Sequence, residues 1–158
     1  MAAQSPLRIV HCFRSPTGGV FRPIRDLTAA PLSAGHQVGV ICDSSTGDAH
    51  DERQLEQFAT TLPLGLHRFP MARGIAPSDL MGVLRTRALL RVMTPDVAHC
   101  HTAKGGVFGR LGGTFLAPFG RKPARLYSPH GGSLHFDPKS AKGKLFFVAE
   151  RALERVSS

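Results

Sequence analysis

The sequence has no tryptophan and only one tyrosine, and it has 11 acidic residues against 20 Lys and Arg. Its aromatic residues are few, and its basic residues are scattered rather than clustered. Because single-stranded nucleic acid is bound by aromatic platforms beside basic grooves, we rank nucleic-acid binding last among the functions considered. The formal net charge of +9 favours other anionic partners, such as phosphates or an anionic membrane surface.

Cysteine is also scarce, with only Cys12, Cys42 and Cys100. An odd number of widely spaced cysteines argues against a disulfide framework, so we expect three reduced, buried thiols. No apolar run approaches the length that crosses a bilayer. The N-terminal residues lack a basic segment leading into a long apolar stretch, so we expect a cytoplasmic protein.

The hydrophobic pattern predicts five short strands that alternate with helices. The predicted strands are 7–13, 37–42, 66–69, 96–100 and 124–128, and the predicted helices are 20–34, 52–60, 78–93, 104–116 and 143–156. This alternation predicts a single α/β domain with a Rossmann-like parallel sheet and helices on both faces.

Apolar residues at helical spacing identify candidate core positions. In the first helix these are Phe21, Ile24, Leu27 and Leu32. In the third helix, which Ser78 is expected to cap, they are Leu80, Leu84, Ala88, Leu89 and Val92. In the last helix one stripe holds Leu145, Ala149, Ala152, Leu153 and Val156.

Unusual residues gather in the loops that follow strands one, four and five. In a doubly wound sheet these strands are neighbours, so the three loops open at the same edge, where such sheets bind ligands. Gly18 and Gly19 suit a phosphate or a hydroxyl-rich sugar, although a tight turn without ligand is the alternative. Arg14 is a candidate to neutralise a diphosphate, with a plain surface charge as the alternative.

Two histidines of the fourth strand, His99 and His101, share one face because they lie two residues apart. This spacing suggests zinc, but no cysteine or acid stands at matching spacing to complete a ligand set, so we expect no metal. We expect His99 to be buried and hydrogen-bonded, and His101 to face the cleft. Lys104 is placed to reach a phosphate or carboxylate, or else is a solvated lysine. His130 suits a sugar hydroxyl, with capping of the backbone as the alternative.

Four segments together resemble the N-terminal domain of glycosyltransferase family 4, in particular bacterial enzymes of exopolysaccharide, capsule or lipopolysaccharide assembly. They read "RSPTGGVFRPIRDLTAAPLSAGHQVGVICDS", "HRFPMARGIAPSDL", "PDVAHCHTAKGG" and "LYSPHGGSLHFDP". The resemblance implies half of a GT-B fold, in which the N-terminal domain binds the acceptor and a second domain binds the nucleotide-sugar donor. It also implies retaining transfer without a required metal or cofactor.

The resemblance assigns His130 the catalytic position beside the reacting sugar. Gly18 and Gly19 would lie against the donor diphosphate, and His101 and Lys104 would line the acceptor side. The expected substrate-binding residues are therefore Gly18, Gly19, Arg14, His101, Lys104 and Gly131. A glycan or lipid-linked acceptor at the inner membrane face would suit the basic surface, since anionic headgroups attract it.

Two departures from the family stand out. The chain ends inside what resembles the N-terminal domain, so we expect residues 1–158 to be an incomplete domain that lacks the donor-binding half and is inactive alone. Pro31 interrupts the first helix, where proline costs about 3 kcal/mol. The alternative function is a lone Rossmann-like nucleotide-binding module, in which Asp43 would bind a ribose, although the G-x-G-x-x-G motif is missing.

Overall fold

The computed structural model describes residues 5–116, 122–130 and 137–155, and within them it shows a five-stranded parallel sheet. The strand order is β3-β2-β1-β4-β5. The strands are β1 (Arg8–Cys12), β2 (Gln37–Asp43), β3 (Leu66–Phe69), β4 (Val97–His101) and β5 (Ala124–Ser128). The predicted fold class, and the placing of strands one, four and five side by side, are therefore confirmed.

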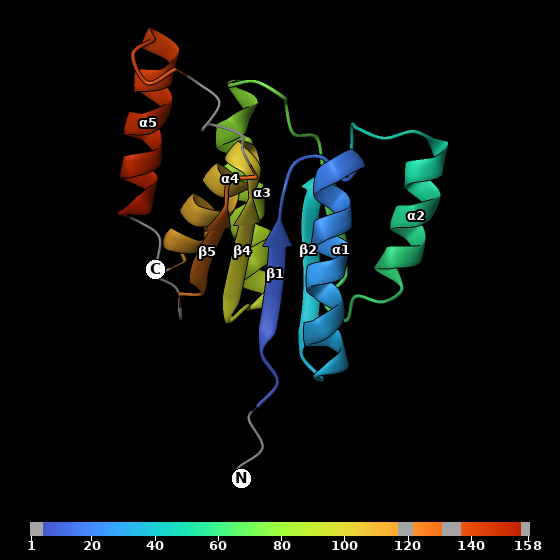
Figure 1. The fold of residues 1–158 in the computed structure, drawn as a ribbon. Coiled ribbons are helices and arrows are strands. Elements are labelled where there is room, and N and C mark those ends of the chain that lie inside the picture. Colours follow the sequence, from blue (N-terminus) through green and yellow to red (C-terminus); the bar gives the residue numbers. More distant parts are fainter. Residues whose placement is uncertain (1–4, 117–121, 131–136, 156–158) are drawn as a thin grey trace.

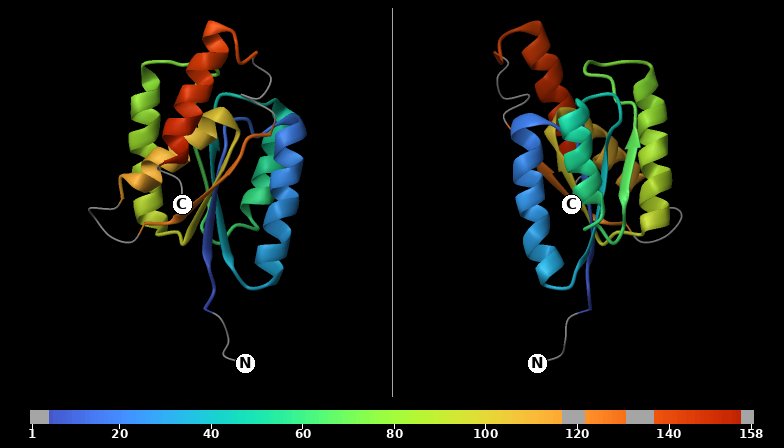
Figure 2. Two further views of the ribbon diagram at one scale, coloured as in Figure 1. Left: turned by 60° about the vertical axis from the view of Figure 1, so that its left-hand side comes forward. Right: turned by 90° about the vertical axis from the view of Figure 1, so that its right-hand side faces the viewer.

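Within the described ranges, five helices pack around this sheet (Figure 1). They are α1 (Gly18–Ser33), α2 (Ala49–Ala59), α3 (Ser78–Met93), α4 (Thr102–Thr114) and α5 (Ala141–Glu154). Helices α1 and α2 cover one face of the sheet, whereas α3 and α4 cover the other, with α5 on the α4 side (Figure 2). Among the described residues, no helix combines the length and apolar character needed to cross a bilayer.

Alternate side chains of β1 and of the residue after it point to opposite faces of the sheet and pack in two separate hydrophobic clusters. Val10 and Cys12 pack with residues of α3 and α4, while Phe13, just after the strand, packs with residues of α1 and α2. A parallel sheet covered on both faces needs such continuous apolar strands. All three cysteines are free and buried, as the sequence predicts.

Two predictions of core positions are wrong. Leu27 is 46% exposed, and in α3 most of the predicted stripe faces solvent, with Leu80 at 71% and Val92 at 78%, although Leu89 packs against the core. The buried face of α3 instead carries Gly82, Val83, Thr86, Leu90 and Met93. A Cβ atom on Gly82 would collide with the ring of Phe108, so this smaller residue allows α4 to pack closely on α3. Close packing therefore selects a face that hydrophobicity alone does not identify.

Helix α1 contains both of its prolines without ending at either. It begins two residues earlier than predicted, so Pro23 lies beyond the first turn, and Pro31 lies in the last turn, two residues before the end at Ser33. Pro31 has no N–H to donate to the Leu27 carbonyl oxygen, so its cost falls on the turn before it. Gly35 follows with a φ of 83° and ends the helix as predicted.

Asp43, at the end of β2, ties together two loops at the carboxyl edge of the sheet. Its buried carboxylate accepts hydrogen bonds from the Met71 backbone N–H at 2.7 Å and from the Ser45 hydroxyl at 2.8 Å, with Thr46 also donating to it. Burial alone would raise the pKa of the Asp43 carboxyl, but these hydrogen bonds hold it below its ordinary value. Both oxygens are engaged within the chain, which argues against Asp43 as a ribose ligand.

Replacing this carboxylate should destabilise the fold. For Asp43→Asn we expect the free energy of unfolding to fall by about 1–3 kcal/mol, because buried backbone and hydroxyl donors lose their charged acceptor. The pKa of Asp43 is depressed in the folded state. Its carboxylate therefore adds to the free energy of unfolding above pH about 4, and this stabilisation is lost as the pH falls further. Urea unfolding at pH 7 and at low pH measures both effects.

The control is Asp26→Asn, which removes an exposed carboxylate from α1. It should change the free energy of unfolding by less than about 0.5 kcal/mol. Equal unfolding midpoints for the two variants at pH 7 would show that Asp43 does not hold the loops together.

The first turn of helix α4 passes close to the end of β1. A Cβ atom on Gly105 would lie 2.6 Å from Cα of Phe13 and would also collide with the carbonyl oxygen of Cys12. Both contacts are with backbone, which cannot move aside as a flexible side chain can. Glycine at this position therefore allows the N-terminal turn of α4 to lie directly against β1.

The substitution Gly105→Ala should lower the melting temperature, because overpacking of this kind costs about 1–3 kcal/mol. The matched control is Gly19→Ala in α1, where an added Cβ atom meets nothing within 4 Å. There alanine should maintain or raise the melting temperature, since it is the better helix former. If Gly105→Ala has the same melting temperature as the wild type, α4 packs less closely on β1 than the structure shows.

Candidate functional site

A cavity of about 630 Å³ opens at the carboxyl edge of the sheet. The loops after β1 and β3 line it together with α4 and α5. Three of its side chains are cationic, namely Arg14, Arg73 and Lys104. The structure therefore brings Arg14 and Lys104, two of the predicted binding residues, to one cavity.

Helix α5 supplies an apolar wall of this cavity through Leu145, Phe146 and Leu153. Its upper end projects past the carboxyl ends of the strands (Figure 2). Leu145 is 61% exposed, so the apolar stripe predicted for the last helix faces the cavity rather than the core. Val156 of that stripe lies outside the described residues.

Glu150 fixes α5 to the rest of the domain. Its carboxylate accepts hydrogen bonds from the Arg110 guanidinium at 2.8 Å and from the Tyr127 hydroxyl at 3.0 Å. The Arg110 guanidinium, which is fully buried, also lies 3.9 Å from the centroid of the Tyr127 ring. A charged, geometrically specific contact thus sets the position of the apolar wall.

Lys104 is held by neighbouring residues rather than free in solvent. Its Nζ donates to both carboxylate oxygens of Asp79 at 2.7 Å and to the carbonyl oxygen of Gly74 at 2.5 Å. Its side chain is only 10% exposed, so the alternative of a solvated lysine is wrong. The contact joins α4 to the start of α3 and to the loop before it, and thereby shapes the cavity rim. A direct role of Lys104 in binding substrate stays a prediction.

Arg14 lines the same cavity from the loop after β1. Its Nε donates to the carbonyl oxygen of Met71 at 3.1 Å, and its own carbonyl oxygen accepts from the Asp43 N–H. These bonds leave the terminal amino groups of the guanidinium to meet a ligand. Arg14 is therefore the predicted residue whose placement best suits an anionic group.

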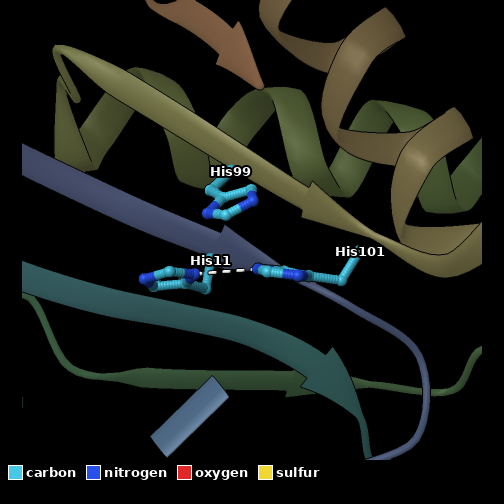
Figure 3. Close-up of side chains that lie close together, drawn as sticks. All are labelled: His11, His99 and His101. Atoms are coloured by element: carbon cyan, nitrogen blue, oxygen red, sulfur yellow. Dashed lines mark hydrogen bonds between the residues drawn. The ribbon is translucent and has the colours of Figure 1, made fainter. Parts of the chain in front are cut away.

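The histidines of β1 and β4 come together on the α1 side of the sheet (Figure 3). Parallel pairing places His11 opposite His99, and His101 follows on the same face. Nδ1 of His11 lies 2.9 Å from Nε2 of His101, and Nδ1 of His101 lies 3.0 Å from Nε2 of His130. His11, His101 and His130 thus form a hydrogen-bonded chain, hereafter the histidine chain, which runs from the core to the surface.

The expected exposures of His99 and His101 are reversed. His101 is fully buried, whereas His99 is only half-buried and hydrogen-bonds to the Ser128 hydroxyl at 2.9 Å. His101 therefore does not face the cleft, and it acts on the surface only through His130. The reversal arises because the loop after β5 brings His130 over the end of β4.

The buried imidazoles are held in their neutral form. Burial, with the neighbouring histidine His99, lowers the pKa of His11 to about 3, and burial with the other histidines lowers that of His101 to about 2. Burial and the nearby His130 also lower the pKa of His99. At neutral pH each of these rings carries one N–H donor and one free acceptor nitrogen.

The buried end of the histidine chain favours one direction of hydrogen bonding. Nε2 of His11 is buried and has no partner, so it is either an orphan N–H or a bare lone pair. Orphan buried N–H groups are the rarer of the two. With the lone pair on Nε2, His11 donates to His101 and His101 donates to His130. His130, exposed and held at a φ of 49°, then presents its Nδ1–H as a donor at the surface.

Gly18 and Gly19 lie apart from this cavity. They line a separate depression on α1 with Arg22, Pro23, Asp26 and Leu27. Gly18 has a φ of 64°, so the turn from β1 into α1 itself requires glycine. Their contact with a donor diphosphate stays a prediction, and Gly131 lies outside the described residues.

Several residues of the site escaped prediction. Asp79, in the first turn of α3, holds Lys104, but its position at a helix start gives no signal of that contact. Arg73 and Glu150 carry no motif, and His11 stands in an apolar run that reads simply as core. The only sequence signal for His11 is its alignment with His99 across the pairing of β1 and β4.

The Lys104–Asp79 pair should be measurably coupled. We expect Lys104→Met and Asp79→Asn each to destabilise the chain, and the double variant to lose less than the sum. The coupling free energy should be about 1 kcal/mol or more, because the pair is partly shielded from water. Urea unfolding of the four proteins measures it, and additive losses would show that the two side chains do not interact in solution.

The sequence was compared with known proteins to identify its family. A family model described as a glycosyl transferase 4-like domain matches residues 18–157, and no curated protein matches the chain. The matched region runs from the start of α1 to beyond α5, and its Rossmann-like parallel sheet is consistent with a GT-B glycosyltransferase domain. The chain belongs to the glycosyl transferase 4-like domain family.

Proposed function

We propose that this chain forms the acceptor side of a retaining glycosyltransferase that transfers a sugar from a nucleotide-sugar to a lipid-linked acceptor in cell-surface polysaccharide synthesis. The supporting observation is the two-sided character of the 630 Å³ cavity. Arg14 and Arg73 provide positive charge on the loop side, and α5 provides an apolar wall opposite. A phosphate joined to a hydrocarbon chain carries both complementary parts.

The charges of the cavity favour an anion near its loops. Lys104 is neutralised by Asp79, and Glu150 is paired with Arg110. In the described part of the cavity lining, Arg14 and Arg73 are therefore the cations without a carboxylate partner. Guanidinium groups suit phosphate because they offer parallel N–H donors. The overall charge of +9 would add a longer-range attraction toward an anionic membrane surface.

His130 would act on the reacting sugar. In the transfer the bond from the anomeric carbon to the donor phosphate breaks, and the acceptor hydroxyl oxygen bonds to that carbon on the same face. The hydroxyl proton passes to the departing phosphate oxygen, so no base is consumed. The Nδ1–H of His130 would donate to a sugar oxygen, and the buried histidine chain would keep that tautomer in place.

Binding of a lipid-linked acceptor tests the proposal directly. Vesicles of neutral lipid that carry a polyprenyl diphosphate-linked sugar should bring the chain with them in flotation at physiological salt, and vesicles without it should not. The variant Leu145→Gln should weaken this binding about tenfold, because it replaces an apolar group of the cavity wall with a polar one.

The matched control is Leu80→Gln on α3, which changes another largely exposed leucine that lies outside the cavity. It should leave binding unchanged. Equal losses in both variants, or flotation that does not depend on the linked sugar, would contradict an acceptor site in this cavity. Affinity for nucleotides without affinity for the linked sugar would favour the nucleotide-binding module instead.

A further inference from the structure

We propose that His11, His99 and His101 bind one Zn²⁺ ion between β1 and β4. Each of the three side chains offers a ring nitrogen, and these atoms all lie within 4.8 Å of one another. Figure 3 shows the His99 ring over the gap that the His11–His101 hydrogen bond spans. The expectation of no metal considered one strand alone, whereas the third ligand comes from the neighbouring strand.

The distances are close to those of a three-histidine site. Ligand nitrogens around tetrahedral zinc lie about 3.3–3.4 Å apart, given Zn–N bonds of about 2.0–2.1 Å. The His11–His101 pair, at 2.9 Å, would open slightly, and the His99 ring would move inward. His99 is only half-buried and has room to turn, so small side-chain rotations are enough.

The chemistry of the donors also suits zinc. Imidazole nitrogens bind zinc in the neutral form, and burial keeps the pKa of both His11 and His101 far below neutral pH. The folded chain therefore does not have to release protons from these two rings to bind the ion. Neutral ligands also leave the full charge of the ion in place. Because His99 is only half-buried, water can reach this side of the site and solvate that charge.

Outer partners of the kind found around metal sites are already present. Ligating histidines usually give their second ring nitrogen to a hydrogen bond, which fixes the ring. His99 has such a bond to Ser128, and His101 has one to His130. With zinc on Nε2 of His101, the Nδ1–H bond to His130 persists in the direction described above.

His11 offers Nδ1 to this site, since that nitrogen lies 2.9 Å from Nε2 of His101. Zinc on Nδ1 takes the place of the proton there, so the neutral His11 ring carries its N–H on Nε2. The ion would join the ends of β1 and β4 beneath His130, and the proposal does not depend on the glycosyl transfer proposed above.

Titration of the metal-free chain with Zn²⁺, in competition with a chromophoric chelator, tests the site. We expect one tightly bound Zn²⁺ per chain and a rise in melting temperature on binding. His99→Gln should weaken binding at least about 100-fold and abolish that rise. Co²⁺ in place of zinc should give the visible absorption of a low-coordinate nitrogen site, and His99→Gln should remove it.

His50→Gln is the matched control, because it removes an exposed histidine from α2. It should leave both the affinity and the stoichiometry unchanged. If His99→Gln does not fold, Ser128→Ala serves instead, since it removes only the bond that orients His99 and should weaken binding about tenfold. The proposal is overturned if the wild type binds no Zn²⁺, or if it binds Zn²⁺ no more tightly than these cluster variants do.

Discussion

The parallel pairing of β1 with β4 is the constraint on which the rest of the structure depends. It sets His11 opposite His99 and Cys12 opposite Cys100, and so places polar rings on one face and thiols on the other. The thiol face accepts α4, which lies directly against the end of β1 because Gly105 has no side chain. Helix α4 follows β4 without any loop, so this contact also fixes where Lys104 stands. A register shift of one residue would exchange the two faces and destroy the core and the site together.

Once the register is set, electrostatics governs the edge of the sheet. The imidazoles cannot hold a second proton in the interior, so they bond to one another as neutral rings. A chain of neutral rings has a direction, and its buried end decides that direction because an orphan N–H there is costly. The tautomer of the exposed His130 ring thus depends on His11, which is buried in the core. Residues that act on a surface group in this way position it without contacting substrate.

The strands were predictable from the sequence, because apolar runs bounded by turn residues are a local signal. Which face of each helix is buried was harder to predict. In α3 the exposed Leu80 and Val92 fit the hydrophobic pattern better than the buried Gly82, whose small size matters only because Phe108 packs on it. The contact of Lys104 with Asp79 and that of His11 with His101 join residues distant in sequence. Such contacts follow from strand order and register, which local patterns do not contain.

Helix α5 reverses the usual arrangement of an amphipathic helix. Its acid Glu150 points inward to the buried Arg110, whereas Leu145 and Val148 are largely exposed. A buried ion pair adds little net stability, because desolvation offsets much of the attraction, but it tolerates only one geometry. The pair therefore specifies where α5 lies more than how firmly the domain folds. The exposure of Leu145 is explained if the helix serves as a wall for a ligand, since contact with a hydrocarbon chain would then bury this side chain.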